Sequence, residues 1–385
     1  MLQKVDHFLP VSKPEISKDT IDELVKIINS GWIATGPKTK QFEENLSNFF
    51  DGRTALTVTS NTAGLYITLK MFDIGPGDYV VTTPLTFVAT VNAIMLAGAT
   101  PLFVDVDKNT FNIDVNKIAK LNNDKIKAVI PVHYAGLPID MDPLLELAKQ
   151  RNWRVIEDAA HAMGAYYKGR KIGTFGDVQV FSFHPIKNMT TGEGGCIVLD
   201  KSEHDLQRFV ELFRFHGIDR SIWDRFSKKG NQTYDVAMPG FKFNMSDIQS
   251  VIGCHQLSEL DEMNKKRREI IARYREAFKD IADITMQGVP SYDHVHSGHL
   301  FPILLKDTQT RDDLSAFLKE HNIGTTPYYF PVHLFSYYKD KYGYKVGDFP
   351  IAEYIGFRVL CLPLYPSLLE EEQTFVINRI LEFFK

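Results

Sequence analysis

The chain has 385 residues, of which 44% are hydrophobic and 24% are charged, a composition typical of an ordinary globular protein rather than a disordered one. Its net charge of −4 at pH 7 gives no electrostatic reason to expect a nucleic acid as partner. The length predicts two domains rather than one small core.

Sequence features also bear on where the protein resides. Its three cysteines lie far apart without metal-ligand spacing or a disulfide framework, which favours a reducing cytoplasm. The N-terminus lacks the basic and apolar segments of a signal peptide, and no apolar run approaches the length of a membrane span. A cytoplasmic protein without a membrane partner is therefore expected.

The basic run 265–268 lies in a long helical pattern and indicates a solvated helix face.

The first two thirds of the chain predict an α/β fold. An extended arm, residues 1–14, precedes helices over Ser17–Asn29 and Lys40–Phe50. Strands and helices then alternate, with strands Ala55–Thr59, Tyr79–Thr82, Pro101–Val104, Ala128–Val132 and Arg154–Ile156 and helices Thr62–Met71, Phe87–Leu96, Val115–Leu121 and Pro143–Gln150. This alternation predicts right-handed crossovers and a mainly parallel central sheet covered on both faces.

Beyond Gly240 the pattern changes. A capping box, Ser246 to Gln249, opens a long helix that continues through Phe278. The rest mixes strands and helices: strands Leu300–Leu305 and Val359–Leu362, a helix over Asp312–Glu320, and a last helix after a second capping box at Ser367–Glu370. We therefore expect a large domain at 15–255 and a smaller α+β domain at 256–385, with arm 1–14 packing near the smaller one.

Lys187 is the most unusual residue of the chain. It lies between an apolar strand around Val178–Phe181 and a glycine-rich turn at Gly192–Gly195. Burial shifts the pKa of a lysine readily, and the amine can then act as a nucleophile that forms a Schiff base with an aldehyde cofactor. The glycines would allow a sharp turn and a close approach to a ligand.

Asp158 ends an apolar strand earlier in the chain, at the edge where open α/β sheets place their ligands. A lysine that forms a Schiff base and an aspartate on a pyridinium nitrogen are the minimal pair for pyridoxal 5'-phosphate (PLP). The alternatives are a structural surface lysine and an ordinary strand-end aspartate.

Two strand-to-helix turns supply further candidates. Thr62 and Ala63 lie at a helix start, where backbone N–H groups and the helix dipole bind phosphates, although Asn61 or Thr62 could simply cap the helix. Ser182 would add a hydroxyl group to the same phosphate. Phe87 follows another such turn, and its default interpretation is a buried core residue.

These motifs together resemble a known family. The stretch from Ser182 through Lys187 to Gly195, with Glu157–Ala162, resembles the DegT/DnrJ/EryC1/StrS family of PLP-dependent nucleotide-sugar aminotransferases, and the likeness extends from Gly31 to Pro363. Within the family, the chain is most similar to the enzyme type that makes UDP-4-amino-4-deoxy-L-arabinose, through residues 131–136, 223–225, 240–244 and 294–296.

The resemblance implies a fold-type-I aminotransferase and a role for each candidate. Lys187 would carry PLP and act as acid and base, while Asp158 would keep the ring nitrogen protonated. His161 would contact the phenolic oxygen and Phe87 would stack on the ring. The loop Gly240–Asn244, through Lys242 or Asn244, would reach the cofactor phosphate of a neighbouring subunit, which implies a homodimer with composite sites. Many relatives carry asparagine and then arginine at these two positions, and the family usually has glycine at position 61.

The implied reaction is transfer of the amino group of glutamate to the C4 keto group of a nucleotide-linked sugar, with UDP favoured, for a surface polysaccharide or lipopolysaccharide. Amination at C3 and a GDP- or dTDP-linked sugar remain alternatives. Two rival classes are a PLP-dependent sugar dehydratase, which would have histidine in place of Lys187, and a catalytically silent homologue. Further positions match the family without decisive chemistry, and packing or loop hydrogen bonds are equally expected there: His133, Arg214, His216, His299 and His333. The histidines show no metal-ligand spacing.

Overall fold

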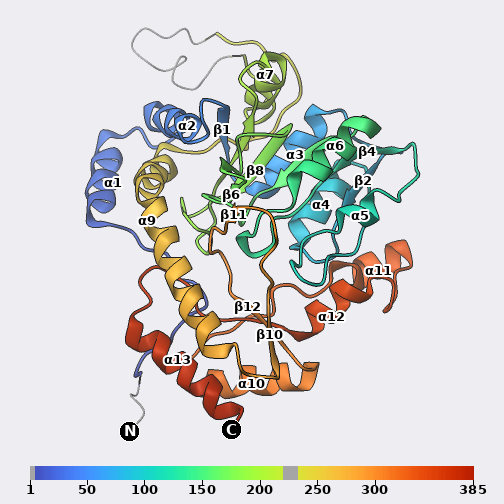
Figure 1. Cartoon of the computed structure of the whole chain (residues 1–385). Coiled ribbons are helices and arrows are strands. Elements are labelled where there is room, and N and C mark those ends of the chain that lie inside the picture. The colour runs from blue at the N-terminus through green and yellow to red at the C-terminus, as the bar shows by residue number, and fades with distance from the viewer. Residues whose placement is uncertain (1–4, 220–232) are drawn as a thin grey trace.

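A computed structural model describes residues 5–219 and 233–385, and a seven-stranded sheet forms its centre (Figure 1). The strand order is β1-β9-β8-β5-β4-β2-β3, and only β9 runs antiparallel to its neighbours. The mainly parallel sheet is therefore confirmed. Its strands are β1 (Thr54–Val58), β2 (Tyr79–Thr82), β3 (Thr100–Phe103), β4 (Ile126–Val129), β5 (Arg154–Asp158), β8 (Val178–Ser182) and β9 (Gly195–Leu199).

Helices cover both faces of this sheet, because its strands are apolar on both sides. One core joins Phe42, Leu144 and Leu260 to one face, and another joins Leu65 and Ile94 to the other. The helices of this part are α1 (Lys18–Ser30), α2 (Pro37–Phe49), α3 (Asn61–Met71), α4 (Val88–Leu96), α5 (Val115–Ile118), α6 (Met141–Arg151) and α7 (His204–Phe213), with a 3₁₀ turn, η1 (Tyr134–Gly136).

The second helix begins earlier than its predicted start at Lys40. Pro37 occupies its first turn, and the carboxylate of Asp247 accepts hydrogen bonds from the backbone N–H groups of Gly36, Lys38 and Thr39, at 2.8, 3.1 and 2.9 Å. A helix start needs acceptors for its free N–H groups. Here the acceptor comes from a distant helix, which local sequence could not indicate.

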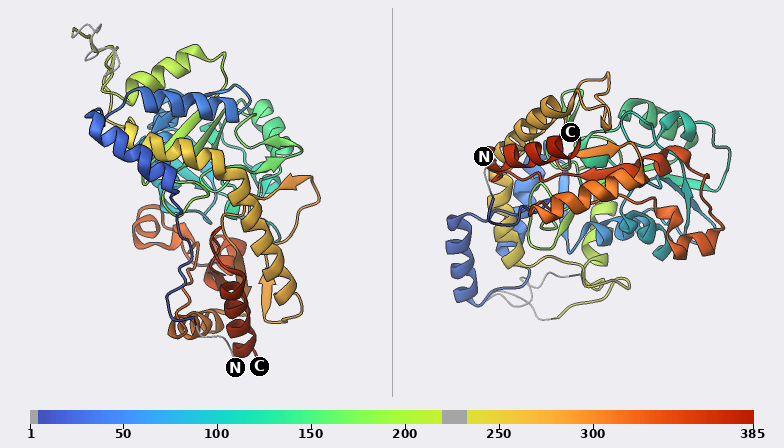
Figure 2. Two further views of the ribbon diagram at one scale, coloured as in Figure 1. Left: turned by 90° about the vertical axis from the view of Figure 1, so that its left-hand side faces the viewer. Right: turned by 90° about the horizontal axis from the view of Figure 1, so that it is seen from below.

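The long helix α9 (Asp247–Phe278) runs from the central sheet to a second, antiparallel sheet (Figure 2). Its capping box of Ser246 and Gln249 is confirmed. The second sheet has the order β10-β12-β13. The elements of this part are β10 (Ile284–Met286), β12 (Pro302–Leu305), β13 (Val359–Cys361), α10 (Thr308–Glu320), η2 (Val332–Leu334), α11 (Ser336–Tyr342), α12 (Pro350–Arg358) and α13 (Glu370–Phe383).

We retain the division into 15–255 and 256–385 as a proposal; its boundary falls within α9. Leu9 of the N-terminal arm is buried in the core of the second part and bridges Ile323. The capping box predicted at Ser367 is wrong. Helix α13 begins at Glu370, and the carboxylate of Glu372 accepts a hydrogen bond from the backbone N–H of Leu369 at 2.8 Å. The Ser367 hydroxyl is buried and has no partner within 5–219 and 233–385.

A third small sheet, β11-β6-β7, links the two parts of the chain. It pairs β11 (His294–Val295) with β6 (Tyr166–Tyr167), which also pairs with β7 (Arg170–Lys171). Among the residues that the structure describes, no helix is both long enough and apolar enough to cross a membrane.

Candidate active site

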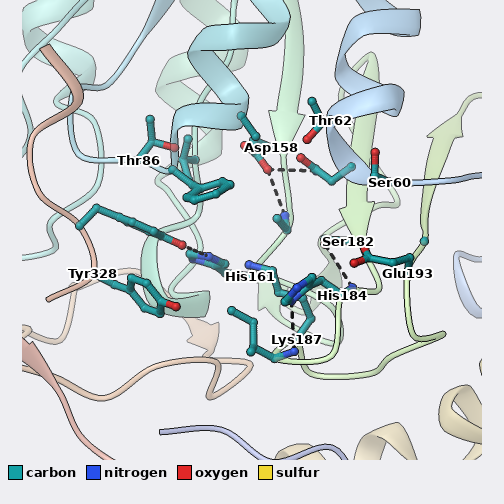
Figure 3. Close-up of a pocket in the computed structure, with 18 residues that line it drawn as sticks. Ser60, Thr62, Thr86, Asp158, His161, Ser182, His184, Lys187, Glu193 and Tyr328 are labelled. Carbon is teal, nitrogen blue, oxygen red and sulfur yellow. Dashed lines mark hydrogen bonds between the residues drawn. The ribbon is translucent and has the colours of Figure 1, made fainter. Parts of the chain in front are cut away.

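A cavity of about 280 Å³ lies at the carboxyl ends of the central strands (Figure 3). Asp158 ends β5, Ser182 ends β8, and Ser60 and Thr86 follow β1 and β2. This edge is where open α/β sheets bind ligands. Of the residues predicted from sequence, the cavity wall contains Thr62, Phe87, Asp158, His161, Ser182 and Lys187.

The turn that carries Lys187 is held in place by its neighbours. The side-chain amide of Asn188 donates to Oδ1 of Asn264 at 2.8 Å and to the carbonyl of Ser297 at 2.9 Å. No hydrogen bond or ion pair joins Nζ of Lys187 to any residue within 5–219 and 233–385. Loss of hydration lowers the pKa of Lys187 to about 8, although the negative charge of Asp158 opposes this shift. About a tenth of this amine is therefore uncharged at pH 7, far more than for an ordinary lysine.

Asp158 is buried, and both of its carboxylate oxygens accept hydrogen bonds. Oδ1 accepts from the side-chain amide of Asn61 and the backbone N–H of Ala160, each at 3.2 Å, and Oδ2 accepts from Oγ1 of Thr90 at 2.7 Å. Burial nevertheless raises the pKa of Asp158 above its ordinary value, while these bonds act in the opposite direction. The carboxylate is fixed in orientation.

His161 lies beside the cavity with one of its nitrogens unpaired. Its Nε2 lies 2.9 Å from the hydroxyl of Tyr329, and its ring centroid lies 4.2 Å from that of His299. Burial lowers the pKa of His161 well below its ordinary value, so the ring is neutral. Its Nδ1 is buried without a hydrogen-bond partner among the described residues. Such an atom in a native structure is usually satisfied by water or a ligand.

The start of α3 forms another part of the wall. Ser60 is the cap, because its hydroxyl oxygen accepts a hydrogen bond from the backbone N–H of Ala63 at 3.1 Å. The alternative that Asn61 or Thr62 caps this helix is therefore wrong, and Ala63 itself does not line the cavity. Gly195 lets β9 approach this helix, since a Cβ there would lie 2.8 Å from the backbone nitrogen of Asn61.

The default interpretation of Phe87 as a core residue is wrong. Its side chain is 55% exposed and lines the cavity, with its ring centroid 6.1 Å from that of Tyr329. A flat ligand could lie against this ring.

Lys242 and Asn244 do not line the cavity of their own chain. Nζ of Lys242 donates to Oδ1 of Asn244 at 2.6 Å and lies 4.6 Å from the ring centroid of Phe215. The amide of Asn244 donates to the hydroxyl of Thr35. Burial lowers the pKa of Lys242.

The residues of this site that sequence reasoning missed include Ser60, Thr90 and Tyr329. Thr90 could have been found from sequence, because it follows Thr86 by four positions at a helix start and therefore lies on the same helix face. In the structure the two hydroxyls lie 2.9 Å apart. Tyr329 comes from a distant loop and carries no local signal. Three of the undecided matches pair with carboxylates elsewhere: His133 with Glu157, Arg214 with Glu43 and His333 with Glu353.

The residues present fit PLP group by group. Asp158 can face a ring nitrogen, and the unpaired Nδ1 of His161 can face a ring oxygen. Lys187 offers an amine without a protein partner among the described residues. The N-terminus of α3, with hydroxyls of Thr62 and Ser182, can receive a phosphate.

Comparisons with known proteins agree with this fit. The model of the DegT/DnrJ/EryC1/StrS aminotransferase family matches residues 14–381. The spore coat polysaccharide biosynthesis protein SpsC of Bacillus subtilis is 42% identical over 389 residues, covering 100% of this chain and 99% of SpsC. The PLP form of Spr1654 from Streptococcus pneumoniae superposes with a TM-score of 0.90 at 29% identity, covering 98% of each chain. The sugar aminotransferase CalS13 from Micromonospora echinospora gives a TM-score of 0.86 at 28% identity, covering 97% of this chain and 99% of CalS13.

The family match spans nearly the whole chain, and the structural neighbours share its architecture along their full length. The predicted fold-type-I architecture and the PLP cofactor are therefore confirmed. The chain belongs to the DegT/DnrJ/EryC1/StrS aminotransferase family and is a PLP-dependent aminotransferase.

Proposed function

We propose that this protein transfers the amino group of glutamate to the C4 keto group of a nucleotide-linked sugar, with UDP as the favoured nucleotide, in the cytoplasm. The observation that carries the proposal is the presence of Lys187 and Asp158 in one cavity. The sugar substrate is supported by CalS13, which is a sugar aminotransferase, and a role in surface polysaccharide synthesis is supported by the name of SpsC. A role in lipopolysaccharide synthesis is the alternative.

PLP, when bound, supplies an electron sink and carries the amino group between the two substrates. In our proposal the uncharged amine of Lys187 attaches the cofactor and then moves a proton at the substrate carbon. Asp158 holds a proton at the ring nitrogen, His161 donates a hydrogen bond to the ring oxygen, and Phe87 covers one ring face. Thr62, Ala63 and Ser182 hold the phosphate, Ala63 as part of the first turn of α3.

We further propose a homodimer in which the loop Gly240–Asn244 reaches the neighbouring subunit's cofactor phosphate. This loop directly precedes the capped start of α9, where N–H groups favour an anion. Lys242 and Asn244 do not line the cavity of their own chain, as expected if they serve another one.

Among the alternatives, a PLP-dependent sugar dehydratase is disfavoured because it would have histidine in place of Lys187. A homologue without catalytic activity is disfavoured because both Lys187 and Asp158 are present. Amination at C3 and GDP- or dTDP-linked substrates remain open. Assignment to the UDP-4-amino-4-deoxy-L-arabinose subgroup stays a prediction, and one of its matching stretches, 223–225, lies outside the described residues.

The test is a screen of UDP-, GDP- and dTDP-linked 4-keto-sugars with glutamate, read by mass spectrometry, with the Lys187→Ala variant as control. We expect a product in which an amino group replaces the keto oxygen of a UDP-linked sugar, with loss of an equal amount of glutamate. Formation of 2-oxoglutarate without any aminated sugar would reject the substrate class.

A further inference from the structure

Two sequence features that the proposed reaction does not use meet in a second pocket. It has a volume of about 110 Å³ and lies between α9 and the segment 287–302, which runs from β10 to β11 and back to β12 (Figure 1). Arg268, from the basic run 265–268, and Arg275 line it from one side. They are seven positions apart and therefore lie on the same helix face. His294 and His296 line it from the other side.

The predicted solvated face of the basic run is thus only half correct. Lys265 and Lys266 are exposed, but Arg267 is buried and Arg268 is partly buried in the pocket wall. One run of four basic residues therefore supplies both pocket-lining and solvent-exposed cations.

The positive charge of this pocket has no counter-charge among the described residues that line it. None of the described residues that line it is an aspartate or a glutamate. Neither Arg268 nor Arg275 forms an ion pair with any residue in 5–219 or 233–385, whereas Arg273, on the same helix, pairs with Glu370 at 3.4 Å. The guanidinium of Arg275 donates to the backbone carbonyl of Gln287 at 2.5 Å.

His296, unlike the two arginines, is an uncharged donor of the pocket wall. Nδ1 of His296 accepts a hydrogen bond from the backbone N–H of Gly298 at 2.8 Å. Burial, followed by the charges of Arg275, His294 and Arg268, lowers the pKa of His296 to about 3. His296 is therefore neutral at pH 7, and its Nε2 carries a hydrogen that can be donated.

We propose that this pocket binds a phosphate group, held by the guanidinium groups of Arg268 and Arg275. Arginine presents a planar set of donors that matches phosphate oxygens, and unpaired cations in a concave site attract such an anion. The volume suits one phosphate group rather than a whole nucleotide.

The position of the pocket links it to the wall of the active site. The segment that carries His294 and His296 continues into Ser297, whose hydroxyl donates to the backbone carbonyl of His161 at 2.6 Å. The next histidine, His299, packs its ring against that of His161 at an interplanar angle of 35°. A phosphate bound between α9 and this segment would therefore hold Ser297 and His299, which contact His161, in place.

The test is a titration of the full-length, PLP-loaded enzyme with inorganic phosphate, followed by calorimetry and by thermal unfolding. PLP loading keeps added phosphate out of the phosphate site next to α3. We expect saturable binding and a rise in Tm. The affinity for phosphate should fall about tenfold in Arg268→Gln and in Arg275→Gln, since each removes one charged donor, and the rise in Tm at a given phosphate concentration should be smaller. Lys265→Gln and Lys266→Gln are matched controls from the same basic run and should bind phosphate as the wild type does.

A parallel titration with UDP identifies the source of the phosphate group. If Arg268→Gln weakens the binding of UDP as well, the ligand is the phosphate of a nucleotide; if it weakens only that of inorganic phosphate, the ligand is free phosphate. The proposal is overturned if the wild type shows no saturable phosphate binding, or if the lysine controls lose as much affinity as the arginine variants. Arg268→Gln breaks no ion pair with a described residue, so its folding is expected to be intact.

Discussion

The side-chain amide of Asn61 donates a hydrogen bond of 3.2 Å to Oδ1 of Asp158. The same amide donates to the backbone carbonyl of Val180 at 2.9 Å, so it joins the first residue of α3 to both β5 and β8. Asn61 thereby connects the helix start that we assign to the phosphate with the carboxylate that we assign to the ring nitrogen. A glycine at this position would make neither bond.

We therefore predict that Asn61→Ala weakens PLP binding. A hydrogen bond to a charged group contributes about 1.5–3 kcal/mol, so the dissociation constant should rise by about tenfold or more. It can be measured by titrating the apoenzyme with PLP and following absorbance. Thr68→Val is a control on the same helix, because its hydroxyl donates to the carbonyl of Gly64 within that helix, and it should leave the affinity unchanged. Equal affinities of wild type and Asn61→Ala would contradict the role.

Asp158→Asn should remove most of the activity, because the amide cannot hold the ring nitrogen protonated. The same substitution should favour the stability of the apoenzyme rather than reduce it, and increasingly so as the pH rises. The folded pKa of Asp158 is raised by burial, so the folded apoenzyme binds more protons than the unfolded chain between the two pKa values, and this residue's contribution to stability falls as pH rises. The Tm of apo Asp158→Asn relative to the apo wild type should therefore increase from pH 4 upwards (~4 is the ordinary pKa of aspartate). Turnover within a few-fold of wild type would reject the catalytic role.

The pKa of Lys187 leads to a prediction about cofactor loading. Only the uncharged amine can attack an aldehyde, and the pKa of this amine is about 8. The rate at which the apoenzyme forms its covalent bond with PLP should therefore rise with pH and level off above about 8. Stopped-flow absorbance would follow this rate. A plateau reached only near the ordinary lysine pKa of about 10.4 would show that burial does not shift this group.

Most of the central sheet could be predicted from sequence, because its strands are short apolar runs that alternate with helical periods. The Lys187–Asp158 pair was also accessible, since both residues end or follow such runs. What sequence could not show depends on contacts between distant segments. The carboxylate of Asp247 extends α2 by supplying acceptors from another helix, and Tyr329 reaches His161 from a loop far along the chain. The exposure of Phe87 depends on the space left by the surrounding elements, which its neighbours in sequence do not reveal.

The composite site can be tested by complementation. A chain inactivated by Lys187→Ala is mixed with a chain inactivated in the Lys242 and Asn244 loop. In mixed dimers one site should unite an intact Lys187 with an intact loop from the neighbouring subunit, so about a quarter of the wild-type activity should return if subunits exchange at random, since half of the dimers are mixed and each holds one complete site. No recovery, with subunit exchange shown independently, would mean that each site is complete within one chain.

The most direct test of the central claim is to locate the covalent bond between PLP and the protein. The purified enzyme is reduced with borohydride and digested, and the labelled peptide is sequenced by mass spectrometry. The label should lie on Lys187, because it is the one lysine among the described residues that lines the cavity with Asp158. Lys187→Ala should give no label and still bind PLP noncovalently, whereas Lys201→Ala, at an exposed lysine, should label as the wild type does. A label on any lysine other than Lys187 would contradict the assignment of this cavity as the active site.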